Sequence, residues 1–230
     1  MAFPTTGVLD AFTRADEGPL GNSTWSGPLF SGQAQLRLVS NACVVTTDGT
    51  ANSSYWSANT FGPDCEIFVT FNQISTDAAD DVNLFLRIVN PGQANLVDGY
   101  RVLLALVAGG FESYKYFRVD NDSATQLGAT VDPGPDLVNG DKWGAEMIDD
   151  LLIIYTKVGA GAWTALDAGR SDATYTAAGN LAARLDQNVP IYDDFGGGTV
   201  VAGGMQMFLM NPARTDGMGR GGIFPGNRVQ

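Results

Sequence analysis

The chain is built from short apolar or alternating runs, each ended by Gly, Pro, Asn or Asp, and this pattern restricts the folds open to it. No long stretch repeats apolar residues at the helical period of about 3.6 residues. Alternation over roughly four to eight residues is typical of strands with one buried face. The sequence therefore predicts an all-β, antiparallel protein. The candidate strands are residues 35–40, 42–47, 55–58, 66–73, 82–89, 100–107, 111–119, 142–148, 151–158, 163–168 and 182–185.

Turn-forming sequences separate these runs. Asn90-Pro91-Gly92 and Asp132-Pro133-Gly134-Pro135 favour reversal of the chain. Ala108-Gly109-Gly110 predicts a hairpin between two long strands, and Gly159-Ala160-Gly161 predicts another, whose second strand returns Trp163 to the core. About a dozen strands at this spacing fit a two-sheet antiparallel jelly-roll sandwich better than an α/β fold.

Length and charge limit the partners. The 230 residues suit one all-β domain, which commonly has roughly 200 to 250 residues. The net charge of −12 repels nucleic acid, whose phosphates are bound by Lys and Arg. No apolar run reaches the roughly 18 residues of a membrane helix, and the first residues lack the basic and apolar segments of a secretion signal. We expect no nucleic-acid partner, no membrane span and synthesis in a cytoplasm, and we leave self-association open.

Composition changes after Gly198. Residues 199–230 have a net charge of +2, which leaves −14 on residues 1–198, and they contain four of the six methionines. We expect a jelly-roll domain over residues 1–198 and a C-terminal extension over 199–230, which is a strand and arm that docks on a partner. An added strand at 205–210 with a disordered end is the alternative. The docking candidates are Met205, Met207, Phe208, Met210, Arg214, Arg220, Phe224 and Arg228.

Three stretches carry a family resemblance: LDAFTRADEGPLGNSTW (9–25), GDKWGAEMIDDLLIIYTKVGAGAWTAL (140–166) and YDDFGGG (192–198). They resemble segments of the concanavalin A-like lectin/glucanase jelly rolls, in the versions found in minor tail and other virion proteins of actinobacterial phages. The similarity spans roughly residues 8–198. It implies a concanavalin A-like fold in which the first and last strands pair. It also implies a structural role in a virion, as a minor tail or capsid decoration protein with other virion proteins as partners.

Residue types used in catalysis are scarce. The chain has no histidine, and none of its four glutamates begins the Glu-x-Asp-x-x-Glu strand of laminarinase-type glucanases. Cys43 and Cys65 are too few for a structural zinc site. They either pair or remain free, and a reducing compartment favours free thiols. We expect a non-enzymatic protein, with a polysaccharide-active enzyme of carboxylate or tyrosine chemistry as an alternative.

The run Asp193-Asp194-Phe195-Gly196-Gly197-Gly198 admits several interpretations. Its glycines could form an anion nest, but the strand-like Thr199-Val200-Val201 follows in place of the Lys-Ser/Thr of a phosphate loop. Glycines that end the sandwich where the chain turns or approaches another backbone are favoured. We expect no cofactor. Asp10, Asp193 and Asp194 are weak Ca²⁺ candidates, with turn-forming or solvated carboxylates as the alternative.

Alternation in residues 82–89 and 111–119 predicts one outward face that combines aromatic and cationic side chains. Tyrosine stacks on sugar rings, and arginine bonds hydroxyl or anionic groups. The alternative is a solvated or partner-covered face. The resemblance implies a non-enzymatic phage virion protein, located in the virion, and this face makes host-surface carbohydrate a candidate ligand. A free carbohydrate-binding module or lectin is the main alternative. The carbohydrate-binding candidates are Arg87, Arg101, Tyr114, Tyr116 and Arg118.

Overall fold

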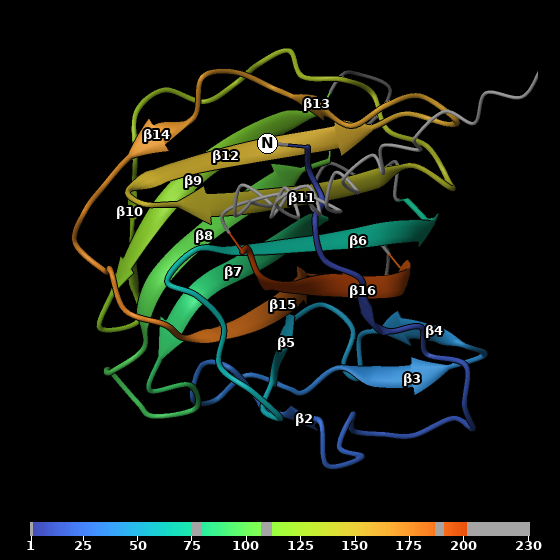
Figure 1. Ribbon diagram of the computed structural model, residues 1–230. Helices are drawn as coiled ribbons and strands as arrows, with labels where there is room; N and C mark the ends of the chain where they lie inside the picture. The colour runs from blue at the N-terminus through green and yellow to red at the C-terminus, as the bar shows by residue number, and fades with distance from the viewer. Residues whose placement is uncertain (1, 75–79, 107–111, 187–190, 202–230) are drawn as a thin grey trace, which may run out of the picture. The chain divides into compact units, whose positions relative to one another are not determined.

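The computed structural model describes residues 2–74, 80–106, 112–186 and 191–201, and these form two antiparallel β-sheets packed face to face (Figure 1). The first sheet has nine strands, in the order β13-β12-β11-β6-β16-β4-β3, with β1 paired to β16 and β14 paired to β12. Its strands are β13 (Thr164–Ala165), β12 (Leu151–Lys157), β11 (Lys142–Ile148), β6 (Cys65–Gln73), β16 (Ile191–Thr199), β4 (Ala42–Val44), β3 (Arg37–Val39), β1 (Val8–Asp10) and β14 (Arg170–Ser171).

The second sheet has seven strands, in the order β10-β9-β8-β7-β15-β5-β2. The predicted all-β, two-sheet antiparallel sandwich is confirmed. The described residues contain no helix, and therefore no helix that could span a membrane. The strands of this sheet are β10 (Ser123–Gln126), β9 (Ser113–Asp120), β8 (Asp98–Ala105), β7 (Asp81–Val89), β15 (Asn180–Asp186), β5 (Ala51–Trp56) and β2 (Trp25–Ser26).

The main core lies between the sheets and is rich in aromatic rings, among them Trp25, Tyr100, Trp143 and Tyr192. A second apolar cluster lies on the outer face of the seven-stranded sheet. There Leu29 and Phe30, which precede β3, pack with β7, β9 and β15 side chains, including Phe85. Both faces of this sheet are therefore partly covered, which is why β7 is buried along almost its whole length.

The glycine-rich stretch is strand β16, which lies inside the nine-stranded sheet between β6 and β4 (Figure 1). A Cβ at Gly196 would collide with the ring of Phe68, and one at Gly197, where φ is +151°, would collide with the carbonyl oxygen of Glu66. Glycine is required here for close approach between strands, as predicted. The glycines also lie at the end of the last described strand, as expected: they pair with β6, and within the strand only Thr199 follows them.

The first and last described strands pair, as the resemblance implied, with Val8 opposite Gly196. Strands β8 and β9 also pair as a hairpin, but its predicted turn, 108–110, lies outside the described residues. The core position predicted for Trp163 is wrong. Its ring packs edge-on against Phe3 and Phe68, on the outer face of the nine-stranded sheet, where the N-terminal segment crosses β11, β6 and β16 (Figure 1).

The two cysteines are buried and free, which decides between the alternatives left by the sequence. Cys43 is on β4 and Cys65 on β6, and β16 lies between these strands. Burial raises the pKa of the Cys65 thiol to about 12, so it stays protonated at neutral pH. The docking candidates between Met205 and Arg228 lie outside the described residues, and the boundary at 198/199 stays a prediction.

Candidate functional site

The five predicted carbohydrate-binding residues do not share an outward face. Tyr114 and Tyr116 are 0% exposed and point into the core between the sheets. The Tyr114 hydroxyl donates to the carbonyl oxygen of Pro135 at 3.0 Å, and the Tyr116 hydroxyl donates to Asp167 Oδ1 at 2.7 Å. Alternation correctly grouped these two tyrosines on one side of β9, but that side is the inner one. The prediction that they are exposed is wrong.

Arg87 is also buried, at 1% exposure, because β7 has an irregularity at this point. Its φ of +52° and the shift in register interrupt the alternation of β7, so its side chain does not point outward as predicted. The guanidinium donates to the carbonyl oxygens of Pro63, Tyr175 and Asp149, at 2.6 to 2.9 Å. Asp64 lies 3.7 Å from it. Arg87 thus joins three loops and has no free donor face toward solvent.

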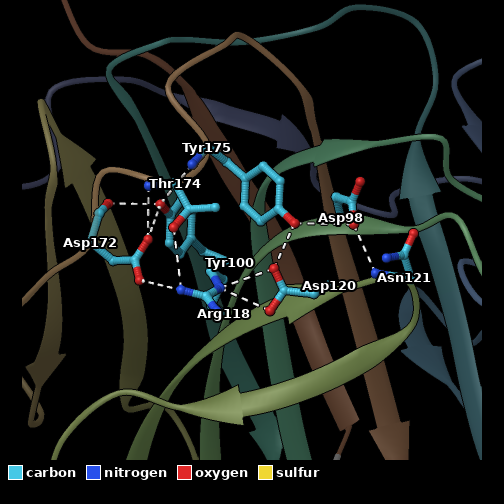
Figure 2. Close-up of polar contacts among 8 residues, drawn as sticks. All are labelled: Asp98, Tyr100, Arg118, Asp120, Asn121, Asp172, Thr174 and Tyr175. Atoms are coloured by element: carbon cyan, nitrogen blue, oxygen red, sulfur yellow. Dashed lines mark hydrogen bonds and ion pairs between the residues drawn. The ribbon is translucent and has the colours of Figure 1, made fainter.

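Arg118 belongs to a polar network at one end of β8 and β9 (Figure 2). Its Nε lies 2.8 Å from Asp120 Oδ2 and its Nη1 lies 3.0 Å from Asp172 Oδ2. The Tyr175 hydroxyl donates to Asp120 Oδ1 at 2.7 Å, and the Tyr100 hydroxyl bonds Asp172. Figure 2 shows these side chains directed toward one another, so the guanidinium is already occupied by carboxylates.

The electrostatics of this network support a structural role. Burial alone would raise the pKa of Asp172, but hydrogen bonds from Thr174, Tyr100 and Arg118 outweigh it and hold that pKa below its usual value. Burial raises the pKa of Tyr100 to about 12. All three partners stay in the charge states that bind one another at neutral pH. The network therefore fastens the segment that contains Asp172 and Tyr175 onto β8 and β9.

Arg101 lies on the opposite, outer face of the same sheet, directly between Phe85 of β7 and Phe117 of β9. Its guanidinium carbon is 4.0 Å from the centre of the Phe117 ring. Its Nε is buried and has no hydrogen-bond partner, and no ion pair reaches the guanidinium from the described residues. Arg101 is thus a largely buried cation with an aromatic neighbour and no acceptor.

A cavity of about 210 Å³ lies beside Arg101, and we call it the Arg101 pocket. Burial, together with the nearby charge of Arg184, lowers the pKa of Arg101 to about 10, so the group is still charged at neutral pH. The other charged groups in the pocket have partners. Arg184 Nε lies 2.9 Å from Asp186 Oδ1, and the Asp122 carboxylate accepts hydrogen bonds from two backbone N–H groups. The lining is Phe30, Ser31, Gln33, Arg101, Val119, Asp122, Ala124 and Arg184.

Sequence reasoning named Arg101 as a candidate but did not name the other residues that line the pocket. Arg184 interrupts the apolar run of β15, and this was the available signal for an outward cation on that strand. Phe30 and Gln33 lie in a segment outside the sheets, so no periodicity marks them. A second cavity, of about 510 Å³, is lined by residues such as Val131, Pro133 and Thr164. It has no charged or aromatic lining side chain, and these are the groups by which proteins orient sugars.

The Ca²⁺ candidates do not form a matching donor set. Asp10 accepts hydrogen bonds from the Phe12 backbone, Arg14 and the Trp25 indole, at 2.6 to 2.8 Å. Asp194 accepts from Thr70. Burial, together with the charge of Asp194, raises the pKa of Asp193. Within the described ranges no group of three or more acidic, histidine or cysteine side chains is arranged for a metal, whereas Ca²⁺ takes about six to eight oxygen ligands.

The sheet order and the similarity to solved structures identify the fold as a lectin-like, concanavalin A-like jelly roll, as predicted. Carbohydrate binding module CBM66 from Bacillus subtilis has a TM-score of 0.51 at 16% identity, over 77% of this chain and 93% of that one. The VIP36 exoplasmic/lumenal domain in its Ca²⁺/Man3GlcNAc-bound form has a TM-score of 0.57 at 15% identity, over 79% and 85%.

A third similar structure is the metal-free carbohydrate recognition domain of Emp46p. Its TM-score is 0.54 at 12% identity, over 84% of this chain and 97% of that one. No family model matches the sequence. No curated protein matches it either. At these identities the similarity establishes the fold, and the function has to be argued from the residues of this chain.

Proposed function

We propose that this chain is a non-enzymatic carbohydrate-binding protein whose ligand occupies the Arg101 pocket. The observation that carries this proposal is Arg101 itself, a charged side chain beside a cavity with no acceptor for its buried Nε. A buried donor without a partner costs roughly 1 to 3 kcal/mol. Because Arg101 lines the cavity, a ligand rich in oxygen acceptors, such as a sugar, would accept from the other N–H groups of its guanidinium.

The chemistry of the lining suits a sugar. Gln33 accepts a hydrogen bond from the Ser53 hydroxyl through Oε1, at 2.6 Å, which directs its amide nitrogen to donate elsewhere. Ser31 adds a hydroxyl, and Phe30 adds an aromatic ring to the pocket wall. Pockets for drug-sized ligands have roughly 300 to 1,000 Å³, so a cavity of about 210 Å³ suits a single sugar unit. The names of CBM66 and the Emp46p domain describe carbohydrate binding by those proteins on the same fold.

A binding role is favoured over catalysis because the pocket lacks a free acid or base. Asp122 is its acidic lining residue, and backbone N–H groups of Asn95 and Val97 already occupy that carboxylate. The chain has no histidine. Release of reducing ends from a polysaccharide by the purified protein would contradict this part of the proposal.

A glycan microarray tests the binding. We expect the wild-type protein to bind a defined subset of glycans and Arg101→Ala to lose them. Lys157→Ala, on β12 of the other sheet, is the matched control and should bind as the wild type does. Retention of the same glycans by Arg101→Ala would place the site elsewhere. Absence of binding to every glycan would contradict carbohydrate recognition.

We further propose that the protein is a structural component of a phage virion, docked by its C-terminal arm. The support is the resemblance of residues 9–25, 140–166 and 192–198 to actinobacteriophage virion proteins, and the contrast between an acidic body and a net charge of +2 on residues 199–230. A free lectin or carbohydrate-binding module fits the fold equally well.

Particle composition separates the two roles. A virion protein should be found by mass spectrometry in purified particles, and deletion of residues 211–230 should prevent incorporation while the remaining chain stays folded. High copy number would favour a capsid position and low copy number a tail tip. A free lectin should be absent from particles.

A further inference from the structure

We propose that the Arg101 pocket takes an acidic sugar, such as a uronic acid unit, whose carboxylate pairs with the guanidinium of Arg101. This inference rests on the proposed carbohydrate-binding function and names the class of ligand for that site. It adds a charge requirement, because a neutral sugar satisfies the hydrogen bonds of a guanidinium but leaves its charge without a counterion.

Arg101 is exceptional among the arginines of the described ranges. Each of the other arginines donates to a carboxylate or to a backbone carbonyl oxygen. Arg101 has only the ring of Phe117, and a cation–π contact of this kind contributes about 0.5 to 2 kcal/mol. The residues that have an acceptor are Arg14, Arg37, Arg87, Arg118, Arg170 and Arg184.

Among the described residues, the acidic groups around the pocket form no ion pair with Arg101. Asp186 makes two hydrogen bonds to Arg184, one from Nε and one from Nη2, both at 2.9 Å. Asp122 is held by two backbone amides. Asp186 and Asp81 both favour the charged form of Arg101 electrostatically, but neither forms an ion pair with it. The positive charge is therefore left for a ligand.

The remaining donors favour a sugar ring that carries the carboxylate over a simple anion. Arg184, which lines the pocket, uses Nε and Nη2 for Asp186, and this leaves Nη1 as a donor. The amide nitrogen of Gln33 is a further donor, and it is neutral. One carboxylate at Arg101 and ring hydroxyls at Arg184 and Gln33 would use all three groups together.

The test compares acidic oligosaccharides with their neutral counterparts of the same stereochemistry. Oligogalacturonate and glucuronate-containing oligosaccharides, and the same molecules after reduction of the carboxyl groups, are titrated calorimetrically into the wild-type protein. We expect at least one acidic oligosaccharide to bind more than about tenfold tighter than its reduced form, and to weaken as salt rises.

Arg101→Gln keeps donors at the site without the charge, and it should lose this preference. Lys115→Gln makes the same change in net charge on the neighbouring strand β9, and this variant should keep the preference for the acidic form. Equal binding of acidic and reduced forms, or binding of neutral glycans alone, would overturn the acidic-sugar inference but leave the proposed function intact. Binding of neither class would overturn both.

Discussion

Arg101 lies over the ring of Phe117, 4.0 Å from its centre, and its guanidinium forms no ion pair with any residue that the structure describes. A buried charge without a counterion destabilises a fold. If Arg101 is kept for binding a ligand, it should lower the stability of the ligand-free protein.

Arg101→Met should raise the free energy of unfolding by about 1 kcal/mol, since it removes an unpaired charge and keeps the packing on Phe117. Urea unfolding followed by tryptophan fluorescence measures this. Arg184→Met should instead lower the free energy of unfolding, because it leaves Asp186 without its ion pair. Equal losses in both variants would show that Arg101 contributes to stability as an ordinary paired arginine does.

Arg87→Met should destabilise the protein by about 3 kcal/mol or more, because three backbone carbonyl oxygens lose their charged donor. Arg37→Met is the control, since Arg37 is exposed and its Nε donates to one carbonyl oxygen, that of Val45. Chemical denaturation of both variants gives the difference. A loss in Arg87→Met as small as that in the control would show that the three loops hold their positions without it.

Gly196→Ala should lower the free energy of unfolding by about 1 to 3 kcal/mol, because the added methyl group overlaps the ring of Phe68 and must displace it. Gly7→Ala is a suitable control, as a Cβ there would meet nothing within 4 Å. Thermal unfolding of the two variants should therefore differ in midpoint by several degrees. Similar midpoints would mean that the Phe68 ring moves aside freely.

Glu112 predicts a pH dependence. It is 4% exposed and accepts from the Leu137 backbone N–H, and burial raises its pKa from the usual 4.5 to about 6. The folded state then binds the proton more tightly than the unfolded state, so the stabilisation present below pH 4.5 is lost as pH rises through 6.

Glu112→Gln cannot titrate, so the stability of wild type relative to this variant should fall between about pH 4.5 and pH 6.5. Urea unfolding at both pH values measures the difference. Asp172 does not interfere, because its pKa is lowered from 3.8. Its contribution to stability is lost as pH falls, at pH values below this window. A constant difference between wild type and variant would contradict the raised pKa.

The sheets could be predicted because strand alternation is a local property. Every run proposed from the sequence overlaps an observed strand. The missed strands β1, β2, β10 and β14 have two to four residues, too few to show a period. Strand β16 was not predicted because its three glycines show no alternation, and two of them, Gly196 and Gly197, allow close approach of Phe68 and Glu66 on β6.

The site was predicted less well because alternation separates two faces without saying which one is inner. Tyr116 and Phe117 are equally plausible outward residues in sequence, and the core position of Tyr116 depends on the other sheet. At Arg87 a single irregular residue changes the alternation. Arg101 was selected correctly as an outer-face residue, but its neighbours Phe30 and Arg184 are distant in sequence.

The central place of β16 also bears on how the chain acquires its structure. The strand pairs with β1, β4 and β6, so residues near position 8 meet residues near position 196. During synthesis β6 and β4 emerge long before their common neighbour, and their edges stay open until residue 199 has left the ribosome. Contacts of such long sequence separation form slowly, and open strand edges invite pairing with other chains. The nascent protein therefore depends on its latest described strand for protection against misassembly.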